Sequence, residues 1–571
     1  MSKLLFLVPM HISFESFLNP QHNSRNFKKD DGKIYNSLST DLPLGPISMS
    51  SYIKKHIDID IRLIDFNAEI NSLNSFPYSS FYDCCVDFLK KEDIQPNFVG
   101  VSSLFSPSFF NFIDCGRASK AVFPSAMILG GGNIPTNSYE SIYTGEHQDI
   151  FDALCIGEGE KPLRDLLDST DPVLFAQKSV AWVTKSKIAA KDFEPKHDYI
   201  EDLDEIPFFD YDLCDFDKQA TNQVAGSSFH SVKEKRGFHV MTSRGCPYLC
   251  TFCASHRTHG RSMRIHSVER VREDLTRLVE QYGASTIVFQ DDHLMFDKER
   301  VYQILEIVKE LGVESLYQNG LTLYALDRPM LEAFHSAGVR HLVLPVESGS
   351  EKVLKHQMRK PLKLRISQRV AKDCRELGIY TNTNIMIGMP GETKQDLDEG
   401  RHNLRTVATN WFNIACASPI VGSEMHEIAK KEKYITKETL GADFRTAVVA
   451  TKDFSTEYIQ RYQYRMNLEL NFVFNNDMAA EEYQLALKGF SNVIRLRADH
   501  AFAHFFAAKC FLALNSKEKM IYHKDEYFKH SNSVGWSSWV DFFCLPIEEK
   551  SFDYWSNDEF ASRSERIAVA S

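Results

Sequence analysis

Three cysteines, Cys246, Cys250 and Cys253, constrain this chain more than any other feature. They lie on one short loop with the spacing Cys-x3-Cys-x2-Cys, directly after the strand-like stretch Phe238–Thr242. Three thiolates on such a loop can hold three irons of a cubane cluster and leave the fourth iron open, whereas a cluster used only for electron transfer normally takes four cysteines. An open iron can bind and cleave a substrate, so the spacing predicts a reactive iron–sulfur cluster.

Other interpretations of the three cysteines stay open. A zinc site would need a fourth ligand, and His256 and His259 lie close enough along the chain to supply it. The grouping could also arise by chance. A disulfide framework is disfavoured, because 12 cysteines in 571 residues are sparse and no secretion signal is recognised.

Length and charge narrow the class of protein. A chain of 571 residues suggests about three or four domains. The net charge of −11 argues against a general nucleic-acid surface, which would need clustered cations. The apolar run Leu4–Met10 is too short to span a membrane and is expected to be a buried strand. We therefore expect a cytoplasmic protein that binds neither nucleic acid nor membrane.

The N-terminal third alternates strand-length apolar runs with helical stretches, which predicts a parallel sheet covered on both faces. In such sheets ligands bind beyond the carboxyl ends of the strands. The glycines Gly130, Gly131 and Gly132 follow one predicted strand, and Gly157 and Glu158 follow another; either group is also compatible with a plain turn. The predicted strands are Leu4–Pro9, Asp60–Asp65, Phe98–Ser103, Ala126–Gly130 and Ala153–Ile156, and the helices lie near Ile47–His56 and Phe110–Val122.

From Phe238 onward a strand–helix pattern repeats about six times. Six units are fewer than the eight of a closed TIM barrel, so we expect an open barrel whose active site lies at the carboxyl ends of the strands. The predicted strands are Phe238–Thr242, Thr286–Gln290, Ser315–Gln318, His341–Val346, Thr381–Ile387 and Phe412–Ala417. The predicted helices are Val268–Gln281, Val301–Leu311, Pro329–Ala337 and Ile366–Leu377.

The cysteine loop, with Pro247 and the aromatic Phe252, resembles the signature loop of the radical S-adenosylmethionine (SAM) superfamily. The stretches Pro43–Pro46 and Leu63–Asp65, the three glycines, Gly157–Glu160 and the linker-like Leu203–Pro207 resemble the cobalamin-binding domain that precedes many such enzymes. The resemblance covers roughly residues 1 to 450. It implies an α/β fold with a Rossmann-like cobalamin-binding domain at 1–195, a linker at 196–237 and a partial (β/α)6 TIM-like radical SAM barrel at 238–453.

The resemblance also implies which residues hold the cofactors. Cys246, Cys250 and Cys253 would bind a 4Fe-4S cluster. SAM would contact residues after three of the barrel strands, and cobalamin would contact the glycine-rich turns. The SAM residues are Asp291, Asp292, Glu347, Ser348 and Gly388, and the cobalamin residues are Gly130, Gly131, Gly132, Gly157 and Glu158.

Several of these assignments have alternatives. Asp291 and Asp292 stand where relatives commonly carry Gly-Gly-Glu, so either could hold the methionyl ammonium. Glu347 could instead complement a helix N-terminus. Arg264 could contact SAM or a substrate carboxylate, or form a surface ion pair. His11 stands alone where some cobalamin domains carry Asp-x-His-x-x-Gly, so it is either a lower cobalt ligand or a histidine packed at a strand end.

The region 454–571 is predicted to be helical. Residues 479 to 512 resemble one tetratricopeptide unit, and a solenoid normally needs several. This region is therefore either a helical cap on the barrel or a docking module.

The resemblance implies a radical SAM enzyme that cleaves SAM reductively, with methyl transfer by cobalamin to an unactivated carbon or phosphorus centre as the expected activity. The alternatives are a cyclase, rearrangement or other group-transfer enzyme without methylcobalamin, and, from another class, an iron–sulfur redox or sensor protein. The expected partners are a small-molecule or peptide substrate and a low-potential donor such as flavodoxin or ferredoxin. The sequence identifies no catalytic side chain.

Overall fold

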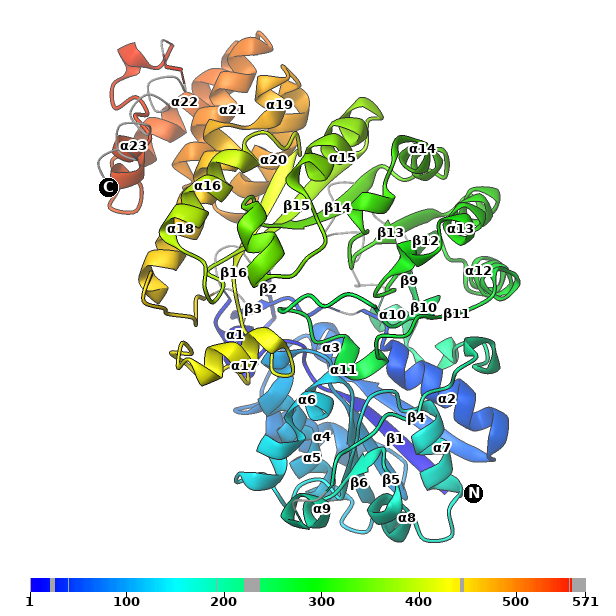
Figure 1. The fold of residues 1–571 in the computed structure, drawn as a ribbon. Helices are drawn as coiled ribbons and strands as arrows, with labels where there is room; N and C mark the ends of the chain where they lie inside the picture. The colour runs from blue at the N-terminus through cyan, green and yellow to red at the C-terminus, as the bar shows by residue number, and fades with distance from the viewer. Residues whose placement is uncertain are drawn as a thin grey trace.

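The computed structural model describes residues 2–20, 26–39, 41–190, 193–219, 237–441, 446–553 and 555–556. An N-terminal α/β domain, a barrel and a set of C-terminal helices follow one another along the molecule, with the barrel in the middle (Figure 1). Of the linker predicted at 196–237, residues 220–236 lie outside the described residues. The barrel borders the N-terminal domain, and the cysteine loop, which belongs to the barrel, lies next to that domain.

A six-stranded sheet in the order β4-β1-β5-β6-β7-β8 forms the N-terminal domain, and all its strands are parallel except the edge strand β8. The chain places β4 and β5 on opposite sides of β1, so the strand order reverses between β1 and β5. Ligands of such sheets bind at this point, beyond the carboxyl ends of the strands. The strands are β1 Ser2–Val8, β4 Ile59–Asp65, β5 Phe98–Ser102, β6 Met127–Gly131, β7 Ala153–Cys155 and β8 Trp182–Val183.

Both faces of this sheet are buried, as the continuous apolar runs predicted. Side chains alternate along β1, so Leu5 and Leu7 join the core beneath α4 and α5, while Leu4 and Phe6 join the core beneath α2 and α7. Helix α2 begins at Leu44, earlier than the predicted Ile47, because a proline is tolerated in a first helical turn. The covering helices are α2 Leu44–His56, α4 Phe81–Lys91, α5 Phe109–Val122, α6 Asn133–Thr144 and α7 Glu160–Asp168.

The six predicted barrel strands are present and form two three-stranded parallel sheets, β13-β12-β9 and β14-β15-β16. Within the described part of the chain no ladder joins the first barrel strand, β9, to the last, β16, so the barrel is open. The strands are β9 Gly237–Val240, β12 Thr286–Phe289, β13 Glu314–Tyr317, β14 His341–Glu347, β15 Tyr380–Ile387 and β16 Trp411–Cys416.

Helices cover the outside of the barrel, and their starts are encoded locally. Ser267, Asp297 and Thr393 each accept a hydrogen bond from the third backbone N–H of the helix that follows, which satisfies one of its free donors. The helices are α12 Val268–Tyr282, α13 Lys298–Leu311, α14 Arg328–Ser336, α15 Leu364–Glu376 and α16 Lys394–Leu404.

The C-terminal helices close one edge of the barrel. The Asn471 side chain accepts from Phe412 N at 2.8 Å and donates to Phe412 O at 2.9 Å. It thus provides hydrogen-bond partners for the backbone N–H and C=O of Phe412 at the free edge of β16. Helices α20 and α21 form a hairpin at the place of the expected tetratricopeptide-like unit, and α21 also packs on α22. The helices are α18 Thr456–Leu468, α20 Tyr483–Leu496, α21 Ala501–Ala513, α22 Lys517–Ser531 and α23 Ser537–Phe542.

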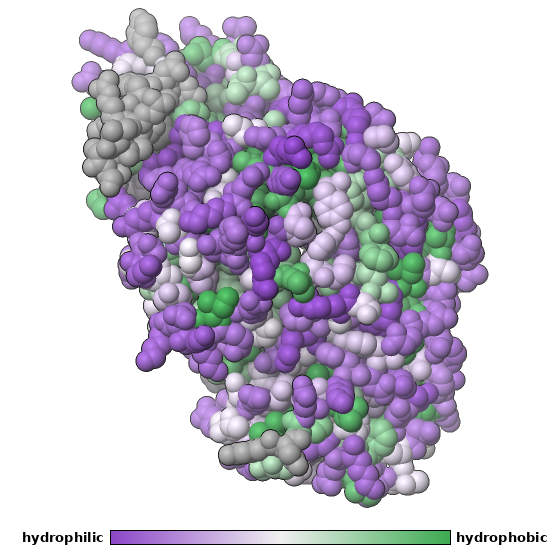
Figure 2. Space-filling view, in the orientation of Figure 1, coloured by the Kyte–Doolittle hydropathy of each residue, from purple (hydrophilic) through white to green (hydrophobic). Residues whose placement is uncertain are grey.

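The face of the molecule in Figure 2 is mostly hydrophilic, with small separate hydrophobic areas. Among the described helices, none combines the length and the apolar character needed to cross a bilayer.

Candidate functional site

The cysteine loop connects two short antiparallel strands, β10 Ser243–Arg244 and β11 Arg264–Ile265, at the carboxyl end of β9. The Cys246 backbone N–H donates to Gly260 O at 3.3 Å and closes the loop at its base. Gly245 has a φ of +92°, and a Cβ there would lie 2.3 Å from Ser262 O, so the residue before the first cysteine must be glycine. The strand pair thus fixes the position at which the loop with the three cysteines begins.

Cys246, Cys250 and Cys253 are partly buried free thiols. Burial and, to a smaller extent, the neighbouring Cys253, Asp292 and Cys250 together raise the pKa of Cys246 to about 12. No three His, Cys, Asp or Glu side chains of the described residues lie close enough together to share one metal ion. In a cubane cluster each thiolate binds a different iron, so three cysteine ligands need not converge on one metal ion.

The loop is held against the far side of the barrel. Thr251 N donates to Met358 O at 3.0 Å, its Oγ1 donates to Gln357 O at 2.6 Å, and Met425 N donates to Thr251 O at 2.8 Å. Phe252 packs on a methionine-rich cluster that contains Met358 and Met425. The segment before the last cysteine is therefore rigidly supported.

Two adjacent aspartates after β12 have different roles. Asp291 is buried and accepts from Thr242 N at 3.1 Å, Thr242 Oγ1 at 2.7 Å and Ser243 Oγ at 2.6 Å. Burial raises its pKa above the ordinary value, and these hydrogen bonds and Arg300 oppose that shift. Asp292 instead lines a cavity, and its Oδ2 is buried without a hydrogen-bond partner. Of the two, Asp292 is the one free to receive an ammonium group.

Glu347 is the last residue of β14 and adopts a φ of +69°, which is unusual for a side chain with a Cβ. It accepts from Lys360 Nζ at 3.2 Å, and its charge contributes to the raised pKa of Cys250, for which burial is the main cause. Because it ends a strand, Glu347 does not lie in the first turn of a helix. Ser348 is buried beside it, and its Oγ accepts from Ser350 N at 3.1 Å.

Gly388 lies at the end of β15 with a φ of +87°. Its backbone N–H donates to Glu392 Oε2 at 2.6 Å, and Met389 N donates to the same oxygen at 3.0 Å. Burial raises the pKa of Glu392 to about 7, although both backbone donors favour the ionised form. The Gly-Met-Pro-Gly-Glu stretch is thus a tight turn around a buried carboxyl group.

A cavity of about 890 Å³ lies between the N-terminal domain and the barrel. The N-terminal domain contributes residues that follow β1, β5, β6 and β7, which is where its strand order reverses. The barrel contributes Phe252, Cys253, Asp292 and Gln318. The cavity therefore joins the predicted cobalamin side to the cysteine loop.

The glycines of this cavity differ in what surrounds them. A Cβ on Gly131 would meet only Cys155 Cβ at 4.0 Å, so this glycine offers bare backbone to open space. A Cβ on Gly130 would lie 2.6 Å from Leu154, and one on Gly132 would lie 2.4 Å from Ser103 O. Gly157 has a φ of +78° and faces His197. Gly131 thus fits a cradle for a bulky ligand, while the others permit packing of the protein itself.

His11 also lines the cavity, at the strand-order reversal. Its ring packs edge-on against Phe105 with centroids 5.0 Å apart, and its Nδ1 is buried without a partner. Burial lowers its pKa, which favours the neutral imidazole.

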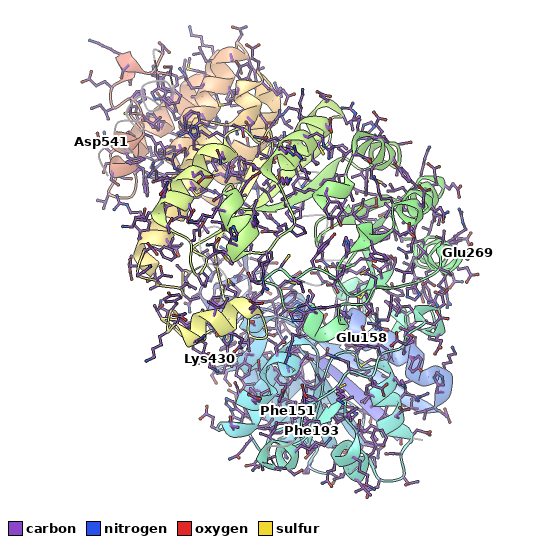
Figure 3. The ribbon with its side chains drawn as sticks, viewed as in Figure 1. Phe151, Glu158, Phe193, Glu269, Lys430 and Asp541 are labelled. Atoms are coloured by element: carbon purple, nitrogen blue, oxygen red, sulfur yellow. The ribbon has the colours of Figure 1, made fainter. Side chains whose placement is uncertain are left out.

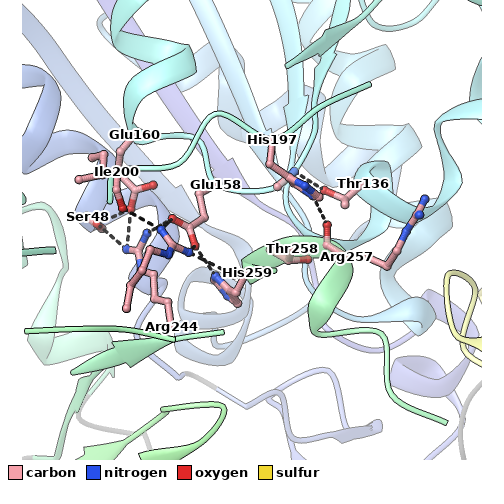
Figure 4. Close-up of polar contacts among 12 residues, drawn as sticks. Ser48, Thr136, Glu158, Glu160, His197, Ile200, Arg244, Arg257, Thr258 and His259 are labelled. Carbon is pink, nitrogen blue, oxygen red and sulfur yellow. Dashed lines mark hydrogen bonds and ion pairs between the residues drawn. The ribbon is translucent and has the colours of Figure 1, made fainter. Parts of the chain in front are cut away.

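Glu158 belongs to a buried ion network at the junction of the two domains (Figures 3 and 4). Arg244 Nη1 donates to Glu158 Oε2 at 2.9 Å, and Arg244 Nη2 donates to Glu160 Oε1 at 2.7 Å. Arg264 donates to both carboxylate oxygens of Glu158, at 2.9 and 2.5 Å, and His259 Nδ1 lies 2.8 Å from Oε1. Burial acts to raise the pKa of Glu158, but Arg244, His259 and Arg264 outweigh it and hold the pKa well below its ordinary value.

This network bears on two residues singled out from the sequence, Arg264 and His259. Arg264 forms a buried bidentate pair and stacks 4.2 Å over the Tyr199 ring, so it is neither a SAM contact nor a surface pair. His259 Nδ1 is engaged by Glu158, so only its Nε2 could reach a metal ion. Sequence reasoning missed Arg244, although the Ser-Arg-Gly-Cys run places it two residues before the first cysteine.

The comparisons with known proteins agree with this geometry. Residues 240–401 match the Radical SAM superfamily, and this match contains the cysteine loop and the ends of β12, β14 and β15. The chain thus carries a radical SAM domain over these residues and is an enzyme.

Similar proteins extend the match toward the N-terminus. The chain is 25% identical over 393 residues to an uncharacterised methyltransferase of Pyrococcus horikoshii, covering 68% of this chain and 79% of the relative. It is 25% identical over 431 residues to a cytidylyl-2-hydroxyethylphosphonate methyltransferase of Streptomyces wedmorensis, covering 69% and 79%.

The fold is also similar to a solved structure, the cobalamin-dependent SAM radical enzyme OxsB with aqua-cobalamin and SAM bound. The TM-score is 0.60 at 14% identity, over 98% of this chain and 84% of that one. At this identity the likeness concerns the fold: an α/β domain followed by an open barrel and helices.

Proposed function

We propose that this chain is a cobalamin-dependent radical SAM methyltransferase acting on an unactivated carbon or phosphorus centre. The observation that carries the proposal is the cavity of about 890 Å³ that Gly131 and His11 border from one domain and Cys253 and Asp292 from the other. Two bulky cofactors could face each other there across a substrate. The relatives named as methyltransferases support the same activity.

The residues present fit these cofactors. Cys246, Cys250 and Cys253 would hold the cluster, Asp292 the methionyl ammonium through a charge-assisted hydrogen bond, and the bare backbone of Gly131 the corrin. When bound, the cluster and SAM supply reductive cleavage of a carbon–sulfur bond, and cobalamin supplies a methyl carrier.

We assign the remaining predicted contacts in the same way. Glu347, Ser348 and Gly388 would contact SAM, and the ends of β6 and β7 would border cobalamin. Glu158 would act indirectly, by joining the domain that holds cobalamin to the strand pair that carries the cysteines. In this proposal residues 1–195 bind cobalamin, 238–453 hold the cluster and SAM, and 454–571 cap the barrel of a cytoplasmic enzyme.

Anaerobic reconstitution tests the proposal. The wild-type protein should bind about four irons and four sulfides, release 5′-deoxyadenosine from SAM under dithionite, and retain cobalamin through gel filtration. Cys250→Ala should lose the cluster and SAM cleavage. Gly131→Val should lose cobalamin while keeping the cluster, because a branched side chain would fill the cradle. Gly283→Ala, at a helix end with open space around it, is the matched control.

The outcomes separate the candidate functions. A protein that cleaves SAM but binds no cobalamin would favour the cyclase or rearrangement class. A cluster that does not respond to SAM would favour an iron–sulfur sensor and contradict the proposal. Label transfer from methyl-labelled SAM to candidate substrates would then identify the acceptor.

A further inference from the structure

Lys360 is a largely buried cation beside the cysteine loop. It follows the short π-helix Val353–Gln357, and its backbone N–H donates to Leu354 O at 2.9 Å. Its side chain is 17% exposed, and its Nζ lies 5.9 Å from the centroid of the Phe252 ring. Phe252 directly precedes Cys253, so the cation lies against the segment between the second and third cysteines.

An acid at the end of β14 holds this cation in place. Lys360 Nζ donates to Glu347 Oε1 at 3.2 Å, and among the described residues this is the one ion pair that Lys360 forms. The Glu347 side chain is 14% exposed, so dissolved salt screens the pair only weakly. Both groups therefore carry their charge at a defined place next to the loop.

The charge of Lys360 acts on one of the three cysteines. Burial raises the pKa of Cys250, Lys360 is the largest influence that opposes this shift, and Cys253 and Glu347 add to it. A cation that favours the thiolate of Cys250 also favours further negative charge on an iron bound to that sulfur.

The acids of the site act in the opposite direction. Burial and Cys253 raise the pKa of Cys246, Asp292 adds to them, and Arg261 opposes them with a smaller effect. Asp292 near Cys246 and Glu347 near Cys250 would each make it harder to add an electron to a cluster on these thiolates. A cation held beside them offsets that effect.

Two other cations of this segment pair with different elements. Lys352, which precedes the π-helix, pairs with Asp396 of α16 at 2.9 Å. Arg359 pairs with Glu424, the first residue of α17 (Glu424–Lys431). Lys352 is therefore a matched control for Lys360, because it is an ion-paired lysine of the same segment whose partner lies in a helix.

We propose that Lys360 raises the reduction potential of the cluster on the three cysteines by stabilising the negative charge that reduction adds. This inference deepens the proposed function and rests on it, because it requires a cluster at Cys246, Cys250 and Cys253. Reduction transfers one electron from the reductant to the cluster, and no bond forms or breaks in that step. Lys360 is a positioning residue, because its contacts are with Glu347 and the cysteine loop.

A redox titration of the cluster-loaded protein tests the proposal. Dithionite supplies the electrons, SAM is left out, and the electron paramagnetic resonance signal of the reduced cluster is followed against the solution potential. Lys360→Met removes the charge and keeps an unbranched side chain, whereas Lys360→Arg keeps the charge. Lys352→Met is the control, and Glu347→Gln removes the acid of the pair.

We expect Lys360→Met to lower the ratio of reduced to oxidised cluster about tenfold at a fixed potential, equivalent to a midpoint about 59 mV lower for one electron. Lys360→Arg and Lys352→Met should titrate like the wild type. Glu347→Gln should shift the midpoint upward, because removing an acid favours the more negative, reduced cluster. Iron and sulfide contents should be equal in all five proteins.

An unchanged midpoint in Lys360→Met with full iron content would overturn the proposal. A higher midpoint would overturn it as well, because a loosened loop that admits water stabilises the reduced cluster. Loss of the cluster from both Lys360→Met and Lys360→Arg would show a purely structural role. If Lys360→Met alone fails to hold a cluster, Glu347→Gln decides, and a midpoint at or below the wild-type value contradicts the proposal.

Failure of the proposed function would give a different result. The midpoints are measured without cobalamin, SAM or an acceptor, so a protein that transfers no methyl group would still show whether Lys360 sets the potential. A wild type that binds no iron would contradict the proposed function before any variant is compared.

Discussion

At the residue scale, the two neighbouring aspartates of the site, Asp291 and Asp292, have different roles. Asp291 faces the strand that precedes the cysteine loop and accepts three hydrogen bonds, whereas Asp292 faces the cavity with one oxygen unpaired. An aspartate at a strand end can turn either way, and the sequence alone could not distinguish the two. The difference follows from the loop after β12, which ends at Phe289: this loop turns Asp291 onto Thr242 and Ser243 and leaves Asp292 at the cavity.

Replacing these aspartates should therefore have different effects. Asp292→Asn should weaken SAM binding about tenfold and leave the cluster content unchanged, because it removes the charge that would meet the ammonium. Isothermal titration of cluster-loaded protein measures this change. Asp291→Asn should instead lower the free energy of unfolding by about 2 kcal/mol, because a buried amide N–H would face the Thr242 N–H in place of Oδ2 and the remaining donors would lose a charged acceptor. An unchanged SAM affinity in Asp292→Asn would contradict the assignment.

Glu392 should make stability depend on pH. Its folded pKa of about 7 lies above the ordinary 4.5, so the folded chain binds this proton more tightly than the unfolded chain does. Its contribution is fully present below pH 4.5 and is lost as pH rises toward and through 7. Between pH 5.5 and 8 the wild type should lose about 2 kcal/mol relative to Glu392→Gln. Urea unfolding at several pH values measures this difference, and parallel curves would refute it.

At the element scale, two devices hold the site together: close helix packing on strand ends and the ion network between domains. A Cβ on Gly349, just after β14, would lie 2.1 Å from Gly400 O in α16, so the helix lies directly on this turn. The network joins Glu158, before α7, to Arg244 in β10 and Arg264 in β11. Both interactions fix the ends of strands and helices that carry the residues predicted to contact the cofactors.

Gly349→Ala should push α16 away and lower the free energy of unfolding by about 3 kcal/mol, since backbone cannot yield as a side chain can. Gly283→Ala is the control. It has a φ of +66° but open space around it, and should cost about 1 kcal/mol. Thermal and denaturant unfolding would reveal the ordering, and similar losses for both variants would contradict the packing explanation.

Glu158→Gln should cost about 3 to 5 kcal/mol, because Arg264 would keep a buried charge without a carboxylate partner and Arg244 would keep only Glu160. The half-exposed pair of Lys161 and Asp198 provides a nearby control, and Asp198→Asn should cost less than about 1 kcal/mol. Denaturant unfolding compares the two. A Glu158→Gln protein as stable as Asp198→Asn would show that the network does not join the domains energetically.

The sequence predicted the elements well because the strands are buried and bounded by turn residues. β15, for example, was expected at Thr381–Ile387 and spans Tyr380–Ile387. The sequence could not predict the partners of Arg244, because Glu158 is 86 residues away along the chain and only the packing of two domains brings the two residues together. Nor could it predict that Gly131, among three glycines, opens on the cavity, because all three suit a strand end.

At the scale of the whole molecule, the C-terminal helices are bound to the barrel by buried charge. Glu469 is fully buried and accepts from Arg401 at 2.5 Å and from Arg405 at 2.5 Å. Asp477 accepts from Arg375 at 2.7 Å. These contacts join α18 and the residues after it to α15 and α16, so the helices form part of the barrel wall.

Glu469→Gln should loosen this attachment. Leaving Arg401 and Arg405 without their carboxylate should lower the free energy of unfolding by about 3 kcal/mol and make the C-terminal helices the first fragment released in limited proteolysis. Glu482→Gln, which removes an exposed partner of Arg375, is the control and should leave the cleavage pattern unchanged. Identical digestion of all three proteins would contradict this role.

The arginine two residues before the first cysteine is bonded to carboxylates of the other domain, so neither domain of this enzyme can be exchanged alone. A chimera that takes its N-terminal domain from a relative would have to inherit Glu158 and Glu160 together with Arg244 and Arg264. Recombination between such genes should therefore succeed where the crossover keeps all four residues from one parent.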